Sequence, residues 1–94
     1  MEEKAKRIAE LLKLLANEHR LLILCALMKG PLTVGEIHLF TPNITASALS
    51  QHLNQLRMAG ILESEKQGMN VIYRIQDQRA AALLEAIREY YCGD

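Results

Sequence analysis

A run of small neutral polar residues between positions 43 and 60 carries side chains that can read the edges of DNA bases. We expect one helix there, because Leu49, Leu53 and Leu56 repeat at i, i+4 and i+7 and mark a buried stripe. The hydroxyl and amide groups that fall on the other side of this helix donate and accept hydrogen bonds, as readers of a major groove do. They are Ser47, Gln51 and Asn54 on the opposite face, beside Met58, with Ser50 and Gln55 on the flanks. A solvated face of low charge is the alternative, and the helix alone does not decide between the two.

Capping and stop residues place this helix within a larger motif at positions 33–59. Thr45 can accept hydrogen bonds from first-turn amides, and Gly60 can take the left-handed conformation that ends a helix. A short helix is expected over 34–40, with Thr33 as its N-cap and Pro42 after its end. Two helices joined by a short turn form a helix-turn-helix, in which the second helix enters the groove. From spacing alone, an ordinary helical hairpin is the commoner outcome.

Two strands are expected after the motif, over 61–66 and 71–75, with a tight turn at 67–70. A hairpin directly after a recognition helix is a wing, so the segment 61–75 favours DNA binding. Lys66 at its base and Arg74 beside it could meet phosphates. The alternative is a stabilising two-stranded cap with solvated charges, and one hairpin can be both.

Three further helices are expected around this motif. The helix over 18–29 follows Asn17 as N-cap and is apolar on every side at its centre, so it should form the middle of the core. The helices over 3–16 and 78–91 are amphipathic, and Asp77 caps the second of them. We expect these outer helices to pack on each other and on their copies in a homodimer, through 3–16 and 78–92, because a winged-helix monomer contacts few base pairs. Otherwise they only cover their own core.

Length and composition predict a single domain over 1–94 that is mainly α-helical with a small β-hairpin, a homodimeric winged helix-turn-helix. The net charge is zero, so DNA binding would depend on a few placed charges rather than a basic field. A charged N-terminus and the lack of an apolar run near the ~20 residues of a membrane span predict a cytoplasmic protein without a membrane partner. Cysteines there are reduced by default.

No nucleophile elbow, phosphate loop or paired carboxylate is found at a plausible site, so neither an enzyme nor a cofactor is expected. A protein-interaction module without DNA binding is a rival interpretation. Salt dependence separates the two, because operator binding weakens steeply as salt rises.

Four segments are similar to a known family, the ArsR/SmtB winged-helix repressors. Residues 11–24 resemble the signature of their first two helices, and residues 32–37 resemble their third. Residues 47–60 resemble their recognition helix, and residues 71–75 their second wing strand. The resemblance implies a five-helix homodimer with a wing that binds palindromic double-stranded operator DNA, as a repressor or anti-repressor, and releases it on a signal.

We therefore assign two groups of DNA-binding residues. Ser47, Ser50, Gln51 and Asn54 should contact bases, and Thr45, His52, Gln55, Lys66 and Arg74 should lie nearer the backbone. His52 lies on the edge of the buried stripe, so a structural role is an equal alternative.

Many members of the family sense metals, but the ligand positions do not carry over to this chain. The third helix contains no cysteine, and Arg79, Tyr90 and Gly93 stand where the last helix would supply ligands after Asp77. His19, His38 and His52 have no ligand spacing. No family-type metal site is expected, although a metal or small ligand at a non-standard site is an alternative signal.

The surroundings of Cys25 and Cys92 closely resemble a two-cysteine subgroup of the family that includes the HlyU, BigR, SqrR and YgaV regulators. The resemblance implies a redox switch, in which reactive sulfur species or oxidants join the pair by a disulfide or polysulfide bridge within one subunit. From the residues alone, Cys25 is better explained as a small core residue than as a sensor, and a thiol among leucines reacts slowly. Cys92 would then be the first nucleophile.

Overall fold

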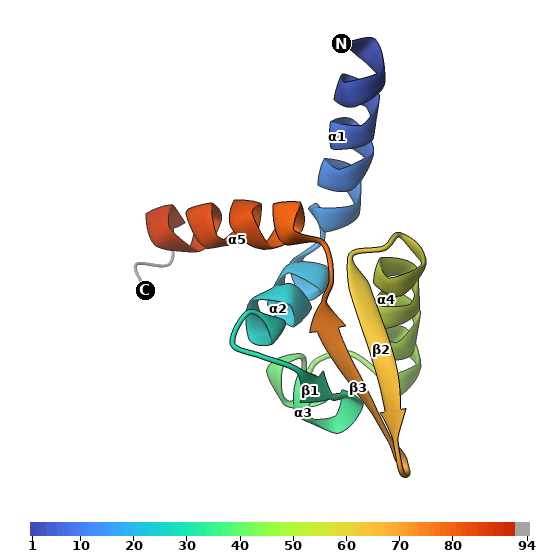
Figure 1. The fold of residues 1–94 in the computed structure, drawn as a ribbon. Coiled ribbons are helices and arrows are strands. Elements are labelled where there is room, and N and C mark those ends of the chain that lie inside the picture. Colours follow the sequence, from blue (N-terminus) through green and yellow to red (C-terminus); the bar gives the residue numbers. More distant parts are fainter. Residues whose placement is uncertain (92–94) are drawn as a thin grey trace.

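The computed structural model describes residues 1–91, with only the backbone of Tyr91. The elements in chain order are α1 (Glu2–Leu15), α2 (Glu18–Leu27), β1 (Leu32–Thr33), α3 (Val34–Phe40), α4 (Ala46–Met58), β2 (Leu62–Gln67), β3 (Asn70–Ile75) and α5 (Gln78–Tyr91). Figure 1 shows α1 rising from a body that α2, α3, α4 and the sheet form together, with α5 lying beside α2. Among the described residues, no helix has the length and apolar character to cross a membrane.

The expected caps are confirmed where local hydrogen bonds define the helix ends. Asn17 Oδ1 accepts from the amides of His19 and Arg20 at 3.0 and 3.1 Å. Thr45 Oγ1 accepts from the Ala48 amide at 3.0 Å, and Asp77 Oδ1 accepts from the Arg79 amide at 2.9 Å. These bonds satisfy amides that have no partner within their own helix.

The other expected signals set the remaining boundaries. Thr33 and Glu36 form a reciprocal capping box at the start of α3. Gly60 has φ +81° directly after α4, as a left-handed helix stop requires. The second helix ends at Leu27, two residues before the expected end, and the recognition helix itself occupies only Ala46–Met58 of the expected 43–60.

The sheet has three antiparallel strands in the order β1-β3-β2. The predicted hairpin is confirmed, with a register that runs from Leu62 opposite Ile75 to Gln67 opposite Asn70. The short strand β1 was not predicted. It places Leu32 opposite Tyr73 and Thr33 opposite Ile72, and two residues are too few to show the alternation that identifies a strand.

The core lies between α2, α4 and the sheet. The stripe of Leu49, Leu53 and Leu56 on α4 is confirmed as fully buried, together with Ile23 and Leu24 of α2. These side chains share one cluster with the apolar residues that surround them, Leu15, Leu27, Ile37, Ile61, Leu62, Ala80 and Leu84. The core therefore fixes which face of α4 points outward.

The second helix is expected to be covered on most sides, and one of its apolar residues lies outside this cover. Leu22 keeps 47% of its surface exposed, although it lies between buried and half-buried apolar residues. Within one chain, α4 and the sheet cover α2 on the sides that face them, but no described part of the chain covers the side that carries Leu22.

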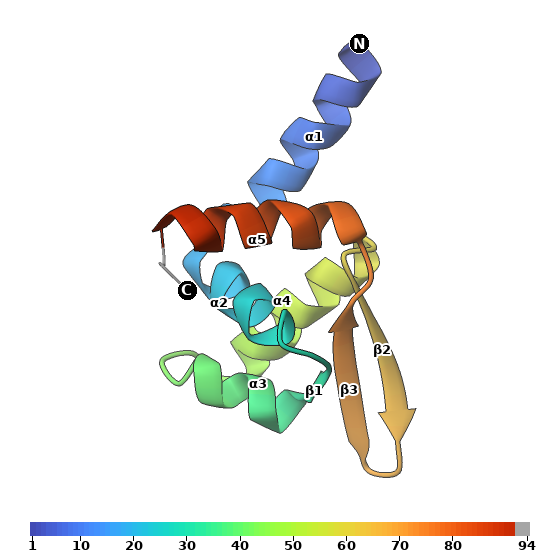
Figure 2. The same cartoon turned by 60° about the vertical axis from the view of Figure 1, so that its left-hand side comes forward.

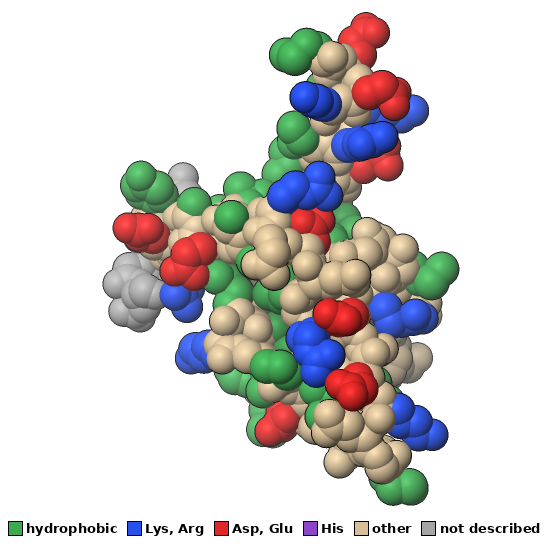
Figure 3. Space-filling model, in the orientation of Figure 1, with side chains coloured by type: hydrophobic (Ala, Val, Ile, Leu, Met, Phe, Trp, Pro, Cys, Tyr) green, Lys and Arg blue, Asp and Glu red, His purple; other side chains and the backbone are tan. Residues whose placement is uncertain are grey.

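The two outer helices diverge instead of packing along each other within one chain. Figures 1 and 2 show α1 standing away from α5 over most of its length, and residues 1–10 are all exposed. Apolar side chains are left open on both helices, with Ile8 56%, Leu12 48% and Tyr90 83% exposed. Figure 3 shows apolar side chains along α1 beside its charged ones, and others on the free part of α5. Within one chain, the predicted packing of the first helix on the last is therefore not seen over most of α1.

Candidate DNA-binding surface

The outer face of α4 brings together the four side chains predicted to contact bases. Ser47, Ser50, Gln51 and Asn54 are all exposed, and they lie across the helix from the buried leucines. Thr45 and Gln55 are exposed beside them. The helix contains no Asp or Glu, so nothing on this face would repel a phosphate backbone. A surface of hydroxyl and carboxamide groups without acids can pair with base edges or with phosphates.

Arg57 belongs to the same surface and was not predicted as a site residue. Its Nη2 donates to Asn54 Oδ1 at 2.8 Å, one turn earlier on α4. This bond occupies the carboxamide oxygen and leaves the amide nitrogen of Asn54 as a donor for a base. The i, i+3 spacing of the two residues could have revealed the pair.

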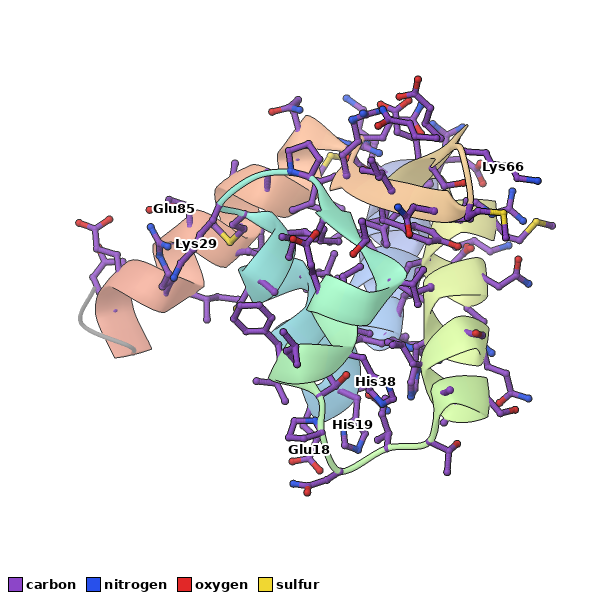
Figure 4. All side chains as sticks on the ribbon, turned by 90° about the horizontal axis from the view of Figure 1, so that it is seen from below. Glu18, His19, Lys29, His38, Lys66 and Glu85 are labelled. Atoms are coloured by element: carbon purple, nitrogen blue, oxygen red, sulfur yellow. The ribbon has the colours of Figure 1, made fainter. Side chains whose placement is uncertain are left out.

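The wing separates its two predicted phosphate contacts. Lys66 is exposed opposite Val71, next to the turn, so it lies near the tip of the hairpin rather than at its base. Side chains alternate along a strand, and the register therefore puts Lys66 and Arg74 on opposite faces of the hairpin. Figure 4 shows Lys66 extending toward the side of the molecule where α4 lies.

Arg74 is half-buried and already has a partner. Its Nη2 lies 3.2 Å from Glu65 Oε1 in an ion pair across the two strands. A phosphate would have to compete with this carboxylate, so the geometry favours Lys66 over Arg74 as the wing contact.

His52 and Gln55 form a polar junction with Arg20, a residue of α2 that the sequence did not single out. Arg20 Nε donates to His52 Nδ1 at 3.3 Å, and Arg20 Nη2 donates to Gln55 Oε1. Burial, the positive charge of Arg20 and the neighbouring His19 together lower the pKa of His52 below its ordinary value of 6.5. The contacts of His52 therefore fit the structural role that the sequence left open beside a contact with the DNA backbone. No local pattern could have revealed Arg20, because these partners lie more than 30 residues away in the sequence.

Cys25 is half-buried in α2 between the buried side chains of Leu24 and Ala26. Cys92, its predicted partner, lies outside the described residues. Within residues 1–91, no group of three or more His, Cys, Asp or Glu side chains is arranged to hold a metal ion. Asp77 is engaged as the cap of α5 and pairs with Arg79 at 3.1 Å, and the hydrogen bond from Arg79 is the main reason that its pKa lies below the ordinary value.

Residues 17–64, about half of the chain, match the profile described as "Bacterial regulatory protein, arsR family". The chain belongs to this family. It is 38% identical to the biofilm growth-associated repressor of Agrobacterium fabrum over 99% of this chain and 79% of that protein. It is also 38% identical to the transcriptional activator HlyU of Vibrio cholerae, over 98% of this chain and 84% of HlyU.

Solved structures of the relatives confirm the winged helix-turn-helix fold. Reduced HlyU from V. cholerae superposes with a TM-score of 0.91 at 38% identity, over 98% of this chain and 96% of that one. The repressor BigR from Xylella fastidiosa superposes with a TM-score of 0.89 at 36% identity, over 98% and 93%. These matches confirm the resemblance to the HlyU and BigR subgroup, and the chain is a transcriptional regulator of the arsR family. The matched relatives are regulators rather than enzymes.

Proposed function

We propose that this protein is a homodimeric transcriptional regulator that binds palindromic operator DNA through α4 and the wing, and releases it when Cys25 and Cys92 are bridged. The observation that carries the proposal is the outer face of α4. It is exposed, free of acidic residues and rich in hydrogen-bonding groups, and a buried leucine stripe fixes its direction.

Ser47, Ser50, Gln51 and Asn54 are the proposed base contacts, because they lie at the centre of this face. Thr45, Gln55 and Lys66 are the proposed backbone contacts, with Arg57 added on the strength of its position. His52 and Arg74 are less available to DNA, since each is half-buried and engaged with a partner inside the chain. Either repression or activation is compatible with this surface, as the relatives include a repressor and an activator.

A homodimer would cover the apolar side chains that one chain leaves open on α1, α2 and α5. Those side chains are Ile8, Leu12, Leu22, Ile87 and Tyr90. A related winged-helix domain, Mb0332 from Mycobacterium bovis, is described as homodimeric and superposes with a TM-score of 0.81 at 28% identity, covering 95% of this chain and 82% of that one. A two-fold dimer would present two α4 helices to half-sites about 34 Å apart, one helical turn of DNA.

The DNA-binding proposal is tested by fluorescence-anisotropy titration on the DNA upstream of the protein's own gene, at several salt concentrations. We expect specific binding that weakens as salt rises. Gln51→Ala should weaken it about tenfold, since a bidentate base contact contributes ~1–3 kcal/mol. The matched control is Gln76→Ala, an exposed glutamine between β3 and α5. Equal affinities for the two variants would remove Gln51 from the interface. A failure to bind specifically, on this DNA and on a wider promoter set, would favour the protein-interaction module.

The thiol-switch proposal is supported by the position of Cys25 in the core helix α2 and by the relatives. One HlyU structure that the chain resembles is described as reduced. Formation of a disulfide would remove two protons and two electrons from the thiols of Cys25 and Cys92, which an oxidant accepts, and a polysulfide would insert further sulfur atoms. Either bridge would tie the segment after α5 to α2, and a shift of α5 would change the spacing of two α4 helices in a dimer.

Polysulfide treatment before the same titration tests the switch. Treatment should weaken wild-type binding tenfold or more, about 1.4 kcal/mol, and should spare both Cys25→Ser and Cys92→Ser. An equal loss in wild type and the serine variants would contradict the switch and leave the DNA-binding proposal standing.

A further inference from the structure

The guanidinium of Arg20 joins three parts of the fold at one point. Its Nη1 donates to the carbonyl oxygen of Leu14, in the last turn of α1, at 3.1 Å. Its Nε and Nη2 donate to His52 and Gln55, which lie one turn apart on α4. Arginine suits this task because its planar group presents several donors in a fixed geometry. One side chain of α2 thus connects the end of α1 with the inner edge of the recognition helix.

We propose that Arg20 is a positioning residue, which sets the orientation of α4 relative to α1 and thereby the specificity of operator binding. The consequence for DNA rests on the proposed function, whereas the positioning itself does not. The leucine stripe already fixes which face of α4 points outward, but the hydrophobic effect itself is not directional, so small rotations and shifts of the helix keep the leucines buried. Hydrogen bonds to two successive turns of α4 restrict both the rotation of the helix about its axis and its shift along that axis. Both are side-chain hydrogen bonds that link α4 to α2.

The surroundings of the junction support this role. His19 lies beside His52, with ring centroids 5.9 Å apart. A neutral His52 can accept from Arg20, and its lowered pKa keeps it neutral at neutral pH. The Leu14 carbonyl belongs to the α1 terminus, where the helix leaves its last acceptors without intrahelical donors. Arg20 therefore satisfies groups on both helices that it connects.

Substitutions at Arg20 give the test on DNA. Arg20→Gln and Arg20→Lys are compared with Lys29→Gln, which removes an exposed positive charge just after α2. Figure 4 shows Lys29 beside α5, on the side of the molecule away from α4. Both Arg20 variants should bind operator at least tenfold more weakly than wild type, with unchanged affinity for scrambled DNA. Arg20→Lys should not restore operator affinity, because one ammonium group cannot reproduce the planar arrangement of donors of the guanidinium. Lys29→Gln should bind operator as wild type does.

The salt dependence distinguishes positioning from a direct phosphate contact. Loss of a phosphate contact lowers the slope of log affinity against log salt by about 0.9 for each phosphate released. Positioning predicts an unchanged slope for the Arg20 variants. A reduced slope with equal losses on operator and scrambled DNA would overturn the proposal in favour of a phosphate contact, and wild-type affinity in both Arg20 variants would overturn it outright.

Amide hydrogen exchange of the DNA-free protein tests the positioning without any operator. Exchange should accelerate at least fivefold along α4 in Arg20→Gln and Arg20→Lys, while α2 amides keep their wild-type rates. Two substitutions at His52 guard against misfolding as the explanation. His52→Asn retains an acceptor near the position of Nδ1, so the α4 amides should exchange at the wild-type rate. His52→Leu has no acceptor, so exchange along α4 should accelerate. Unchanged exchange along α4 in all four variants would overturn the proposal. If wild type binds no operator, the proposed function fails and these rates still decide the role of Arg20.

Discussion

The α4 side of the molecule and the side formed by α1 and α5 use their apolar residues in opposite ways. On α4, Leu49, Leu53 and Leu56 are fully buried, and the exposed side chains are mostly hydroxyl and carboxamide groups, with Arg57 and Met58 near the end of the helix. On α1, the apolar residues Ile8 and Leu12 stay exposed because no other described part of the same chain covers them. A helix whose apolar face is buried within its own chain can bind DNA through its polar face. Helices whose apolar faces are exposed are typical of surfaces that bind another protein. The contrast indicates which side of the molecule performs each task.

The largest expected effect is on stability and concerns the buried stripe. Leu53→Ala should lower the free energy of unfolding by about 2–5 kcal/mol, because Leu53 is 1% exposed and its removal leaves a cavity. Leu39→Ala is the matched control, because Leu39 is 79% exposed on α3. Urea unfolding measures both variants. Similar losses at the two sites would contradict the burial of the leucine stripe in the core.

The open side should show its effect in self-association. Leu12→Lys places a charge on the exposed apolar face of α1 and should weaken dimerisation tenfold or more in sedimentation equilibrium. Leu39→Lys introduces the same charge at an exposed leucine on α3 and should leave the association constant unchanged. A monomeric wild type, or equal effects of the two lysines, would break the assignment of α1 to the dimer.

The cap of α5 should contribute a smaller, pH-dependent amount. Asp77→Ala should lower the free energy of unfolding by about 1 kcal/mol at pH 7 through loss of the N-cap. The pKa of Asp77 is lowered in the folded state, chiefly by the hydrogen bond from Arg79, so its stabilisation is present above the ordinary value of 3.8 and disappears as pH falls through the folded value. Urea unfolding at pH 7 and pH 3 should show the difference between wild type and variant shrinking on acidification.

The smallest effect is expected at the junction beside α4. The folded pKa of His52 is lowered from 6.5, so the unfolded chain binds more protons below that value, and its contribution to stability is lost as pH falls from 6.5 through the folded pKa. Between pH 7.5 and pH 5, wild type should therefore lose more stability than His52→Asn, with thermal unfolding as the measurement. Parallel losses would show that His52 keeps an ordinary pKa.

Local spacing was sufficient to predict the parts of the fold whose causes are local. The caps at Asn17, Thr33, Thr45 and Asp77 depend on neighbours two or three residues away, and the α4 stripe follows from helical periodicity. The hairpin also follows from a short turn with Gly68, whose φ is +62°. The surface on α4 could therefore be assembled from the sequence before any contact was known.

The parts that escaped prediction depend on contacts between distant residues. Strand β1 forms because Leu32 meets Tyr73. Arg20 becomes a junction because folding brings His52 and Gln55 to it. Arg74 is paired because the register of the hairpin puts Glu65 on the same face and within reach. In each case the residue type was visible in the sequence, but its partner was set by tertiary structure.

Amide chemical-shift mapping during titration with operator DNA would decide the assignment of the two sides. We expect the largest shifts on α4, from Ala46 to Met58, and near Lys66 on the wing. Amides on α1 and α5 should hardly change, because the proposed dimer buries these helices away from the DNA. Largest shifts on α1 or α5, with α4 unaffected, would show that DNA binds through α1 or α5 and not through α4.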